Sequence, residues 1–440
     1  MPGGRVNLAP PAAASRDAGH TSTRETLRSQ AGAGYLCGMN RRLRKLWPPR
    51  LMRDGVQRAR WCLETWRAAK EVAHRHGLSP MAVIREQAGL FRRHRLDQHS
   101  YYSYRLYEPH LSADEKARYI PDCAPANHQL WALLVPRRYR LLYDNKLVFN
   151  RFFGAVGLPV ATIHGVFEAE LGHTPDGRSL RTAAELGARL REIGGPGFVF
   201  KPMEGIRGDR VLVFSGAAPD DPDAWVTLAG ERYDAERLVA ATADGAELVA
   251  HNPGADTRRF LIEERVRPHP TLEELLGPTL CSVRVQTIVS RAGAPEILAA
   301  VFKLQTGTSG VDHVLHGAVG CWVEPETGVL GRGRSRTDDR DVSTIPGTDR
   351  SFIGLQLPDW DAVRDVALRA AAAFPWARSI GWDIGVSERG PLLIEGNERW
   401  SPSLIQMPAP RGLMTGEMKA LCDELSSAPR PSSKSSRMNA

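Results

Sequence analysis

The sequence lacks the cysteine patterns of metal-binding and disulfide-stabilised proteins. Its six cysteines are scattered along 440 residues as Cys37, Cys62, Cys123, Cys281, Cys321 and Cys422. None of them forms a CxxC pair, and no cluster of Cys and His has the spacing of a zinc site. We therefore expect free thiols in a reducing compartment, which predicts a cytoplasmic protein.

Long apolar runs are also missing. No segment approaches the roughly 18 consecutive apolar residues of a membrane-spanning helix. The first 34 residues lack the continuous apolar core of a secretory signal, although their Arg and Ser content resembles a transit peptide. The simpler interpretation is a disordered leader over residues 1–40, with translation starting at Met1 or at Met39. The Pro- and Ser-rich segment 424–440 is too polar to fold.

The positive charge is concentrated in one region. The net charge is +8, yet residues 41–97 hold 15 Lys and Arg against 5 Asp and Glu, which leaves the rest slightly acidic. One interpretation is a solvated helix surface, and the other is a weak peripheral contact with an anionic membrane surface. No nucleic-acid-binding motif accompanies the charge, so we expect no nucleic acid partner.

The region 41–135 is predicted to be mainly helical. Residues 55–75 show helical spacing, Ser79 and Pro80 have the pattern of a helix start, and Ser112 with Glu115 forms a capping box. The expected buried stripe of the helix over 55–75 comprises Val56, Ala59, Cys62, Leu63, Trp66, Ala69 and Ala73.

After residue 136 the pattern becomes mixed. Helices are predicted around 144–157, 182–193 and 361–374, with short strands between them. The strands are expected in 160–167, 198–202, 210–214, 258–266, 282–290, 296–304 and 317–325. Because strands and helices do not alternate strictly, the sequence predicts an α+β fold.

The stretch "GWDIGVSERGPLLIEGN" predicts a β-hairpin whose turn contains "ERG". If the hairpin is symmetric about Arg389, Asp383 lies opposite Glu395, and Asn397 shares their face. Ile384, Val386, Leu392 and Ile394 would then fill a core on the other face. The two carboxylates and the amide oxygen suit a hard cation such as Mg²⁺. The alternative is a pair of solvated acids.

Two other stretches have anion-binding or nucleotide-binding features. "FVFKPMEGIRGDRVLVF" places Lys201 at a strand end before a loop with Gly205 and Gly208, without a Walker A sequence. The alternative is an ordinary hairpin with a lysine that reaches into solvent. "RRFLIEERV" is an apolar strand that ends at Glu263 and Glu264, and its backbone donors and acceptors could bind a purine. The alternative for this segment is an amphipathic edge strand.

The strand over 282–290 carries Arg284, which shares a face with Ser282 and Gln286. Such an Arg is a candidate phosphate clamp, or it pairs with an acid.

In this order the motifs resemble the ATP-grasp fold, and more narrowly the sugar-transfer-associated ATP-grasp family. The resemblance covers roughly residues 100–410. It rests on "YYSYRLYEP", "VFKPMEGIRGDRV", "SVRVQT", "VDHVLHGAVGCWVEPETG" and "GWDIGVSERGPLLIEGN". It implies two α+β lobes that clasp ATP, an N-lobe over 136–266 and a C-lobe over 267–423.

The resemblance also implies residue roles. It assigns the phosphates to Lys146 and Lys201, a flexible flap to the 203–209 loop with Gly205 and Gly208, and the adenine-reading hinge to Glu263, Glu264 and Val266. Asp383, Glu395 and Asn397 match magnesium ligands, with Glu395 bridging two ions. Arg284 and Lys303 resemble cleft residues that serve the transferred phosphoryl group or the acid substrate.

The sequence departs from the pattern at two positions. Many ATP-grasp ligases carry Arg two residues before the metal-binding Asp, where this chain has Gly381, so the cation is expected from Arg284 or Lys303. His313 stands where the family often shows Asn, which leaves the substrate open.

The resemblance implies a Mg²⁺- and ATP-dependent carboxylate–amine or carboxylate–thiol ligase that works through an acyl phosphate. Its substrates would be small-molecule or sugar-linked acids and amines, in cell-surface polysaccharide or sugar-conjugate biosynthesis. One alternative is a kinase that phosphorylates a hydroxyl, with Asp312, His313 or His316 as the base. Another is a non-catalytic nucleotide-binding module.

Overall fold

The computed structural model describes residues 55–427, apart from 123, 196, 206–207, 209, 244–257, 307–317 and 338. The predictions for the leader, the two start sites, Cys37, Cys123, His313 and the kinase base candidates therefore lie outside the described residues. The four cysteines within them, Cys62, Cys281, Cys321 and Cys422, are free thiols, as predicted. No helix in the described part of the chain is long and apolar enough to cross a membrane.

The N-terminal region is helical, as predicted. Its helices are α3 (Gly55–His76), α4 (Pro80–His94), α5 (Gln98–Ser103), α6 (Ala113–Ala117) and α7 (Ala124–Leu134). The two predicted helix starts are confirmed: Ser79 caps α4 by accepting from Ala82 N, and Ser112 with Glu115 forms the capping box of α6. These caps satisfy backbone donors that have no partner inside the helix.

The predicted buried stripe of α3 is wrong from Ala59 to Trp66, and the side chain of Val56 lies outside the described part of the chain. Ala69 and Ala73 are buried, but Leu63 is 48% exposed and Trp66 is 43% exposed. The buried side instead includes Trp61, Thr65 and Val72. Helix α3 has apolar residues on more than one side, and its packing against α4 selects which side is covered. Spacing alone does not contain that information.

A six-stranded sheet is built from the middle of the chain. Its strands are β1 (Ile163–Phe167), β2 (Phe198–Pro202), β3 (Leu212–Ala218), β4 (Asp221–Thr227), β5 (Arg232–Asp234) and β6 (Phe260–Glu264). Their order is β1-β6-β2-β3-β4-β5, and every pairing is antiparallel. Helices α10 (Ala183–Ile193) and α11 (Ala235–Ala243) contribute Leu186, Leu190 and Leu238 to the core with Phe198, Phe200 and Phe260. Lys201 and Glu263 alternate with these core residues and therefore lie on the opposite face.

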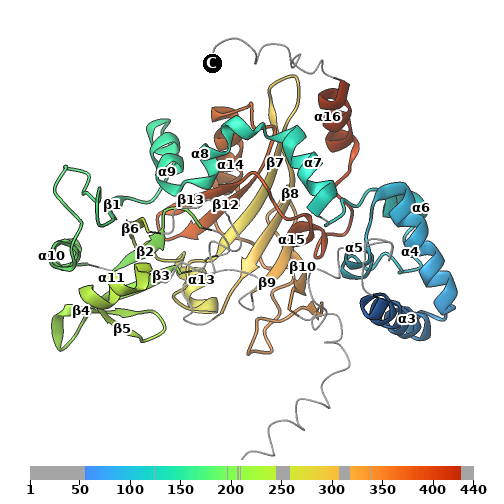
Figure 1. Ribbon diagram of the computed structural model, residues 1–440, viewed down its shortest axis with the longest axis horizontal. Coiled ribbons are helices and arrows are strands. Elements are labelled where there is room, and N and C mark those ends of the chain that lie inside the picture. Colours follow the sequence, from blue (N-terminus) through green and yellow to red (C-terminus); the bar gives the residue numbers. More distant parts are fainter. Residues whose placement is uncertain are drawn as a thin grey trace, which may run out of the picture. The chain divides into compact units, whose positions relative to one another are not determined.

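A seven-stranded antiparallel sheet follows, in the order β11-β10-β9-β8-β7-β12-β13. Its strands are β7 (Ser282–Val289), β8 (Pro295–Leu304), β9 (Val319–Val323), β10 (Leu330–Ser335), β11 (Asp341–Val342), β12 (Ser379–Ser387) and β13 (Gly390–Asn397). Helix α14 (Trp360–Ala373) packs on β7, β8, β12 and β13 (Figure 1). The remaining helices are α13 (Pro270–Leu276), α15 (Pro402–Gln406) and α16 (Gly416–Ser427). The α+β prediction is confirmed, and the expected tail from 424 onward begins inside α16.

Helix α9 (Lys146–Ala155) connects the two sheets. It follows the short 3-10 helix η3 (Arg137–Tyr139) and α8 (Leu141–Asp144). Phe149 and Phe153 pack with Trp382 of β12 in the core of the seven-stranded sheet, whereas Leu147 packs against the residues around Leu261 of β6. This arrangement positions Lys146, the first residue of α9, between the two sheets.

Candidate functional site

The predicted hairpin is formed by β12 and β13, and Asp383 is paired with Glu395. The predicted symmetry about Arg389 is wrong. Ser387 pairs with Gly390, and a bulge between Asp383 and Ile384 then shifts the register by one residue. As a consequence Leu393, rather than Leu392 or Ile394, joins Ile384 and Val386 in the main core. The extra residue of the bulge is what brings the two carboxylates opposite each other.

Asp383 is buried and held by two cations. Its carboxylate accepts from Arg284 Nε at 2.6 Å and from Arg284 Nη2 at 2.9 Å, and Lys303 Nζ lies 3.0 Å from Oδ2. Burial by itself would raise the pKa of Asp383, but Arg284 and then Lys303 outweigh burial and hold it well below its usual range. The alternative of two solvated acids is therefore wrong for Asp383, which is 2% exposed.

Glu395 and Asn397 complete this group. Asn397 Nδ2 lies 3.3 Å from Glu395 Oε1 and 3.4 Å from Asp383 Oδ2. Burial and then the charge of Asp383 raise the pKa of Glu395, and Lys146 opposes this effect only in part. The positive charge near Glu395 is therefore too small to offset the effects of burial and of Asp383 on its pKa.

The second predicted cluster lies on the six-stranded sheet. Lys201 Nζ contacts Glu263 Oε2 at 2.6 Å, and both side chains are buried. The interpretation of Lys201 as a lysine that reaches into solvent is therefore wrong. The edge-strand interpretation of 258–266 is also wrong, because β6 lies between β1 and β2.

Lys146 is the residue that brings the clusters together. Its Nζ donates to Gly205 O at 3.1 Å, and its backbone N donates to Met203 O at 3.0 Å. Burial lowers the pKa of Lys146, Glu395 counteracts this effect, and Lys201 adds to it by repulsion. Lys146 therefore interacts electrostatically with Glu395 at the end of the hairpin and with Lys201 on β2. Two neighbouring lysines suit a polyanionic ligand.

The segment 263–266, which is the predicted adenine hinge, and the residues after it contact both sheets. The side chain of Glu264 accepts from Thr162 N at 2.9 Å and from Arg389 Nη2 at 2.8 Å, so it does not join Glu263 and Lys201. Beyond it, His269 N donates to Val386 O, which ties the chain after buried Val266 to the hairpin. The role of Arg389 was not predicted, because only the tertiary structure brings Glu264 to the hairpin turn.

The glycine loop is described in part. Gly205 supplies the carbonyl that Lys146 contacts, and Gly208 has a φ of +71°, a conformation that favours glycine. Asn145, the N-cap of α9, donates to Glu204 Oε1 at 3.0 Å. These bonds attach the start of the loop to the start of α9.

Gly381 explains how Arg284 reaches Asp383. A Cβ atom at position 381 would lie 2.9 Å from Arg284 Cδ and 3.0 Å from Gln286 Oε1. The arginine side chain therefore occupies the space above Gly381. Arg284 on the neighbouring strand β7 thus places its side chain beside Gly381. The expectation that it replaces the arginine of the family pattern stays a prediction.

The oxygen donors of this site fit magnesium that arrives with a phosphate ligand. Among the described residues, no group of three or more His, Cys, Asp and Glu side chains is arranged to hold a metal by itself. Asp383, Glu395 and Asn397 offer two carboxylates and one amide, and Asn397 would present Oδ1 after half a turn of its amide. Mg²⁺ commonly keeps water and takes ligands from substrate phosphates, with only one or two carboxylates from the protein.

Comparison with known families gives a match over most of the chain. The family model of sugar-transfer-associated ATP-grasp proteins matches residues 125–422. A comparison with the curated proteins finds no match.

Several solved structures are similar at low identity. The biotin carboxylase–beta-gamma-ATP complex from Campylobacter jejuni has 14% identity and a TM-score of 0.37, covering 66% of this chain and 48% of that one. D-cycloserine synthetase DcsG has 15% identity and a TM-score of 0.35, covering 68% and 77%. The ADP complex of PurK, N5-carboxyaminoimidazole ribonucleotide synthetase, has 12% identity and a TM-score of 0.34, covering 64% and 52%. The chain thus spans about half the length of two of these three proteins.

Proposed function

The chain belongs to the family of sugar-transfer-associated ATP-grasp proteins, and on this premise we propose that it is a magnesium- and ATP-dependent ligase. It would join a carboxylate to an amine or a thiol in the biosynthesis of a cell-surface polysaccharide or another sugar conjugate. One observation carries the proposal: Lys146 donates to Gly205 O at 3.1 Å in the loop after β2, and it also interacts electrostatically with both Lys201 and Glu395. This interaction supports a single site that combines the residues predicted to bind phosphate with those predicted to bind the metal.

The lysines would bind the nucleotide phosphates. Lys146 carries a lowered pKa because it is buried and repelled by Lys201, and a bound polyphosphate would offset both effects. Backbone groups from Glu263 to Val266 would read the adenine, and the 203–209 loop would cover the phosphates through the amides around Gly205 and Gly208. Glu264 would hold the hinge against the hairpin through Arg389.

The hairpin would hold the metal. Asp383, Glu395 and Asn397 are the proposed ligands, and the raised pKa of Glu395 indicates a carboxylate that a cation would stabilise. When bound, Mg²⁺ would neutralise charge on the transferred phosphoryl group and orient it. Arg284 and Lys303 concentrate positive charge around Asp383 and would stabilise the negative charge that develops in the reaction.

The reaction would proceed in two steps, phosphoryl transfer and then acyl transfer. An oxygen of the substrate carboxylate attacks the γ-phosphorus of ATP while the bond to the leaving ADP oxygen breaks, which gives an acyl phosphate. The amine nitrogen then attacks the acyl carbon, the bond to phosphate breaks, and the nitrogen loses a proton. Positioning and electrostatics would supply most of the acceleration, as in other phosphoryl transfers.

The test measures ADP release with pools of acids, amines and sugar hydroxyl acceptors, alone and combined. Release that requires both an acid and an amine or thiol supports the ligase. A phosphorylated acceptor without coupling contradicts it in favour of the kinase, whose candidate bases lie outside the described residues. ATP binding without any turnover contradicts it in favour of a nucleotide-binding module.

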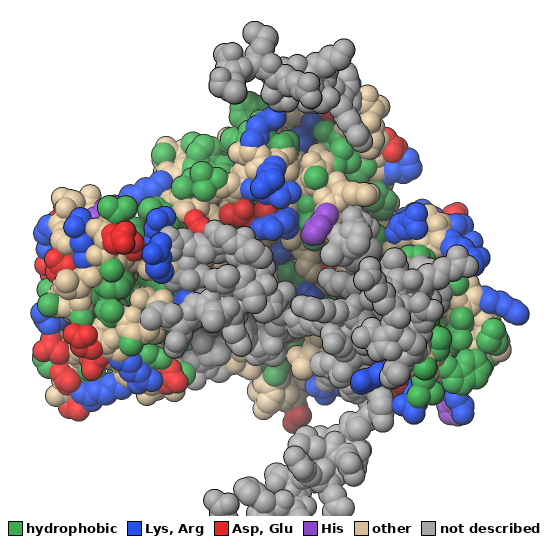
Figure 2. Space-filling view, in the orientation of Figure 1, with side chains coloured by type: hydrophobic (Ala, Val, Ile, Leu, Met, Phe, Trp, Pro, Cys, Tyr) green, Lys and Arg blue, Asp and Glu red, His purple; other side chains and the backbone are tan. Residues whose placement is uncertain are grey.

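A weak membrane contact through α3 is a second proposal that a separate observation supports. Leu63, Trp66, Arg67 and Lys70 follow helical i, i+3, i+4, i+7 spacing and are exposed. Figure 2 shows hydrophobic side chains bordered by Lys and Arg over α3 and α4. Exposed aromatic and basic residues on one helix side suit the interface of an anionic bilayer.

Vesicle co-sedimentation tests this contact. Binding to phosphatidylserine-containing vesicles should weaken at high salt and in the double variant Leu63→Ala/Trp66→Ala. Leu171→Ala removes a leucine outside the helical N-terminal region that is even more exposed than Leu63, and it should change nothing. No binding at low salt would end the proposal.

A further inference from the structure

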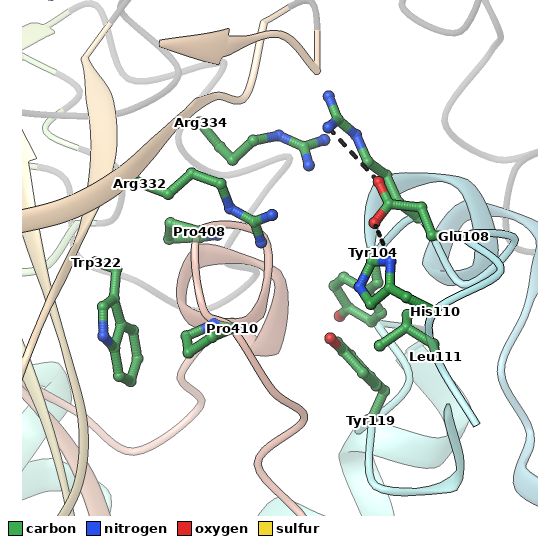
Figure 3. Close-up of a pocket in the computed structure, with 11 residues that line it drawn as sticks. Tyr104, Glu108, His110, Leu111, Tyr119, Trp322, Arg332, Arg334, Pro408 and Pro410 are labelled. Atoms are coloured by element: carbon green, nitrogen blue, oxygen red, sulfur yellow. Dashed lines mark ion pairs between the residues drawn. The ribbon is translucent and has the colours of Figure 1, made fainter. Parts of the chain in front are cut away.

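A pocket of about 330 Å³ lies between the N-terminal helical region and the seven-stranded sheet (Figure 3). One wall comes from Tyr104, Glu108 and Tyr119, and the opposite wall comes from Trp322 of β9 and Arg332 and Arg334 of β10. In the close-up both arginines extend from β10 toward the helical region. Neither the nucleotide site nor the metal site uses any of these residues.

The pocket carries a surplus of positive charge. Its lining includes Arg105, Arg332 and Arg334 against the carboxylate of Glu108. Arg105 is already ion-paired with Asp341 and Glu108, so the surplus lies on Arg332 and Arg334. Arg334 is 2% exposed, and its Nε makes no hydrogen bond, although Asp341 Oδ1 lies 3.5 Å away. Burial and then the neighbouring Arg105 lower the pKa of Arg334, so a bound anion would stabilise this cation.

Arg332 is exposed and partly oriented by the backbone. Its Nη2 donates to Ala409 O at 3.0 Å, next to the lining residues Pro408 and Pro410. This bond directs the guanidinium along the pocket wall, and a guanidinium is suited to two-point contact with a carboxylate or phosphate.

Flat apolar surfaces lie beside this charge. Tyr104 and Tyr119 stack with ring centroids 5.3 Å apart, and Trp322 lines the other wall. An aromatic ring beside hydrogen-bonding groups is suited to a ligand with an apolar ring face and a polar rim. A pyranose has this character, since its C–H groups form apolar faces and its hydroxyls project around the edge.

The pocket and the proposed catalytic residues occupy one face of the same sheet. Asp383 pairs with Arg284, Arg284 with Val301, and Val301 with Trp322. Two residues farther along β8 and β9, Lys303 pairs with Gly320, and Gly320 pairs with Arg334. Directly paired residues share a face. Lys303 and Arg334 are two strands apart, so their Cα atoms are separated by roughly 10 Å.

We propose that this pocket binds the anionic sugar moiety of a substrate, with the acidic group on Arg332 and Arg334 and the sugar ring against Trp322 and Tyr119. The inference rests on the proposed function, because it supplies the sugar-linked substrate of the ligase. It also gives the N-terminal helical region a role, since that region contributes one wall. The negative charge of the ligand could belong to a carboxylate or to a phosphate. Comparison of glucuronate with glucose 1-phosphate in the test distinguishes the two.

Calorimetric titration of the full chain tests the proposal with glucuronate, glucose 1-phosphate, glucose and inorganic phosphate. At least one anionic sugar should bind, and glucose and phosphate should each bind at least tenfold more weakly. Arg332→Ala should weaken binding of that sugar roughly tenfold, the effect of losing one charge-assisted hydrogen bond. Arg332 is exposed, so this variant should fold; Arg350→Ala removes another exposed arginine outside the pocket and should bind normally.

Three results would overturn the proposal: no binding of either anionic sugar, equal binding of phosphate and the sugar phosphate, or unchanged affinity in Arg332→Ala. A titration with a non-hydrolysable ATP analogue separates this inference from the proposed function. Nucleotide binding without sugar binding would remove only the pocket assignment. Sugar binding without nucleotide binding would retain the pocket assignment and contradict the ligase.

Discussion

Asp383 on β12 and Arg284 on β7 are paired directly across neighbouring antiparallel strands, and two nitrogens of Arg284 contact the two carboxylate oxygens of Asp383. Both side chains are buried, and Lys303 approaches the same carboxylate from β8. A buried carboxylate is stable only when its charge is compensated. The contact therefore holds the Asp383 carboxylate in place and maintains its ionised form, which the proposed metal-binding role requires.

Arg284→Leu should lower the free energy of unfolding by about 3 kcal/mol. This value is at the low end of the ~3–5 kcal/mol expected for breaking a buried pair, because Lys303 remains next to Asp383. Urea unfolding followed by tryptophan fluorescence measures the effect. The double variant Arg284→Leu/Asp383→Leu should recover most of the loss. If the two variants were equally unstable, the loss would not come from the unpaired carboxylate.

Glu395→Gln should abolish turnover while leaving the fold intact. The expected decrease in ADP release is at least ~10²-fold, comparable to the loss of one main electrostatic contributor. The thermal unfolding midpoint should stay the same or rise, because the repulsion from Asp383 is removed. Near-normal activity at saturating substrate would show that Glu395 does not hold the metal.

Lys201→Ala should chiefly weaken nucleotide binding, and calorimetry with ATP should show a loss of roughly tenfold or more, as expected for a charged hydrogen bond. The substitution also leaves Glu263 buried without its partner. Lys201→Ala/Glu263→Gln should restore stability without restoring affinity. Lys419→Ala, at an exposed surface pair, is the matched control. Unchanged ATP affinity in the Lys201 variant would end the phosphate-binding assignment.

Magnesium binding should strengthen as pH rises. A carboxylate ligand must be deprotonated, and the pKa of Glu395 is raised by burial and by Asp383. The stability of the ligand-free fold should change in the opposite direction with pH. As pH falls through that pKa, Glu395 becomes protonated and the free energy of unfolding rises. Calorimetry of Mg²⁺–ADP binding in buffers of different ionisation enthalpy should detect proton release. Absence of release in the wild type, or equal release in Glu395→Gln, would contradict this linkage.

Gly381→Ala should disturb the site without touching its charges. The added Cβ would lie 2.9 Å from Arg284 Cδ, so the Arg284–Asp383 contact has to shift. Overpacking of this kind costs roughly 1–3 kcal/mol, and ADP release should fall with the unfolding midpoint. Gly416→Ala adds the same atom where no neighbour lies within 4 Å and should be neutral. Equal behaviour of the two variants would refute the packing argument.

Short-range features were predicted well because they depend on neighbouring residues. Ser79 and Ser112 cap their helices as expected, and Asp383 pairs with Glu395 across the hairpin. The bulge that creates this pairing was not predicted, since the turn residues are compatible with more than one register. The exposed side of α3 was assigned incorrectly because the packing partner of a helix is not encoded in its own periodicity.

By itself the sequence determined the fold class, the helix caps, the hairpin and the residue types that suit phosphate and magnesium. Each of these follows from local spacing and side-chain chemistry. Only the tertiary structure decided that Arg284 and Lys303 compensate Asp383, that Lys146 interacts electrostatically with Glu395 and Lys201, and that Glu264 turns toward Arg389. Those contacts join residues from separate strands and helices, and their energies depend on burial and charge compensation that arise only when the two sheets pack around α9.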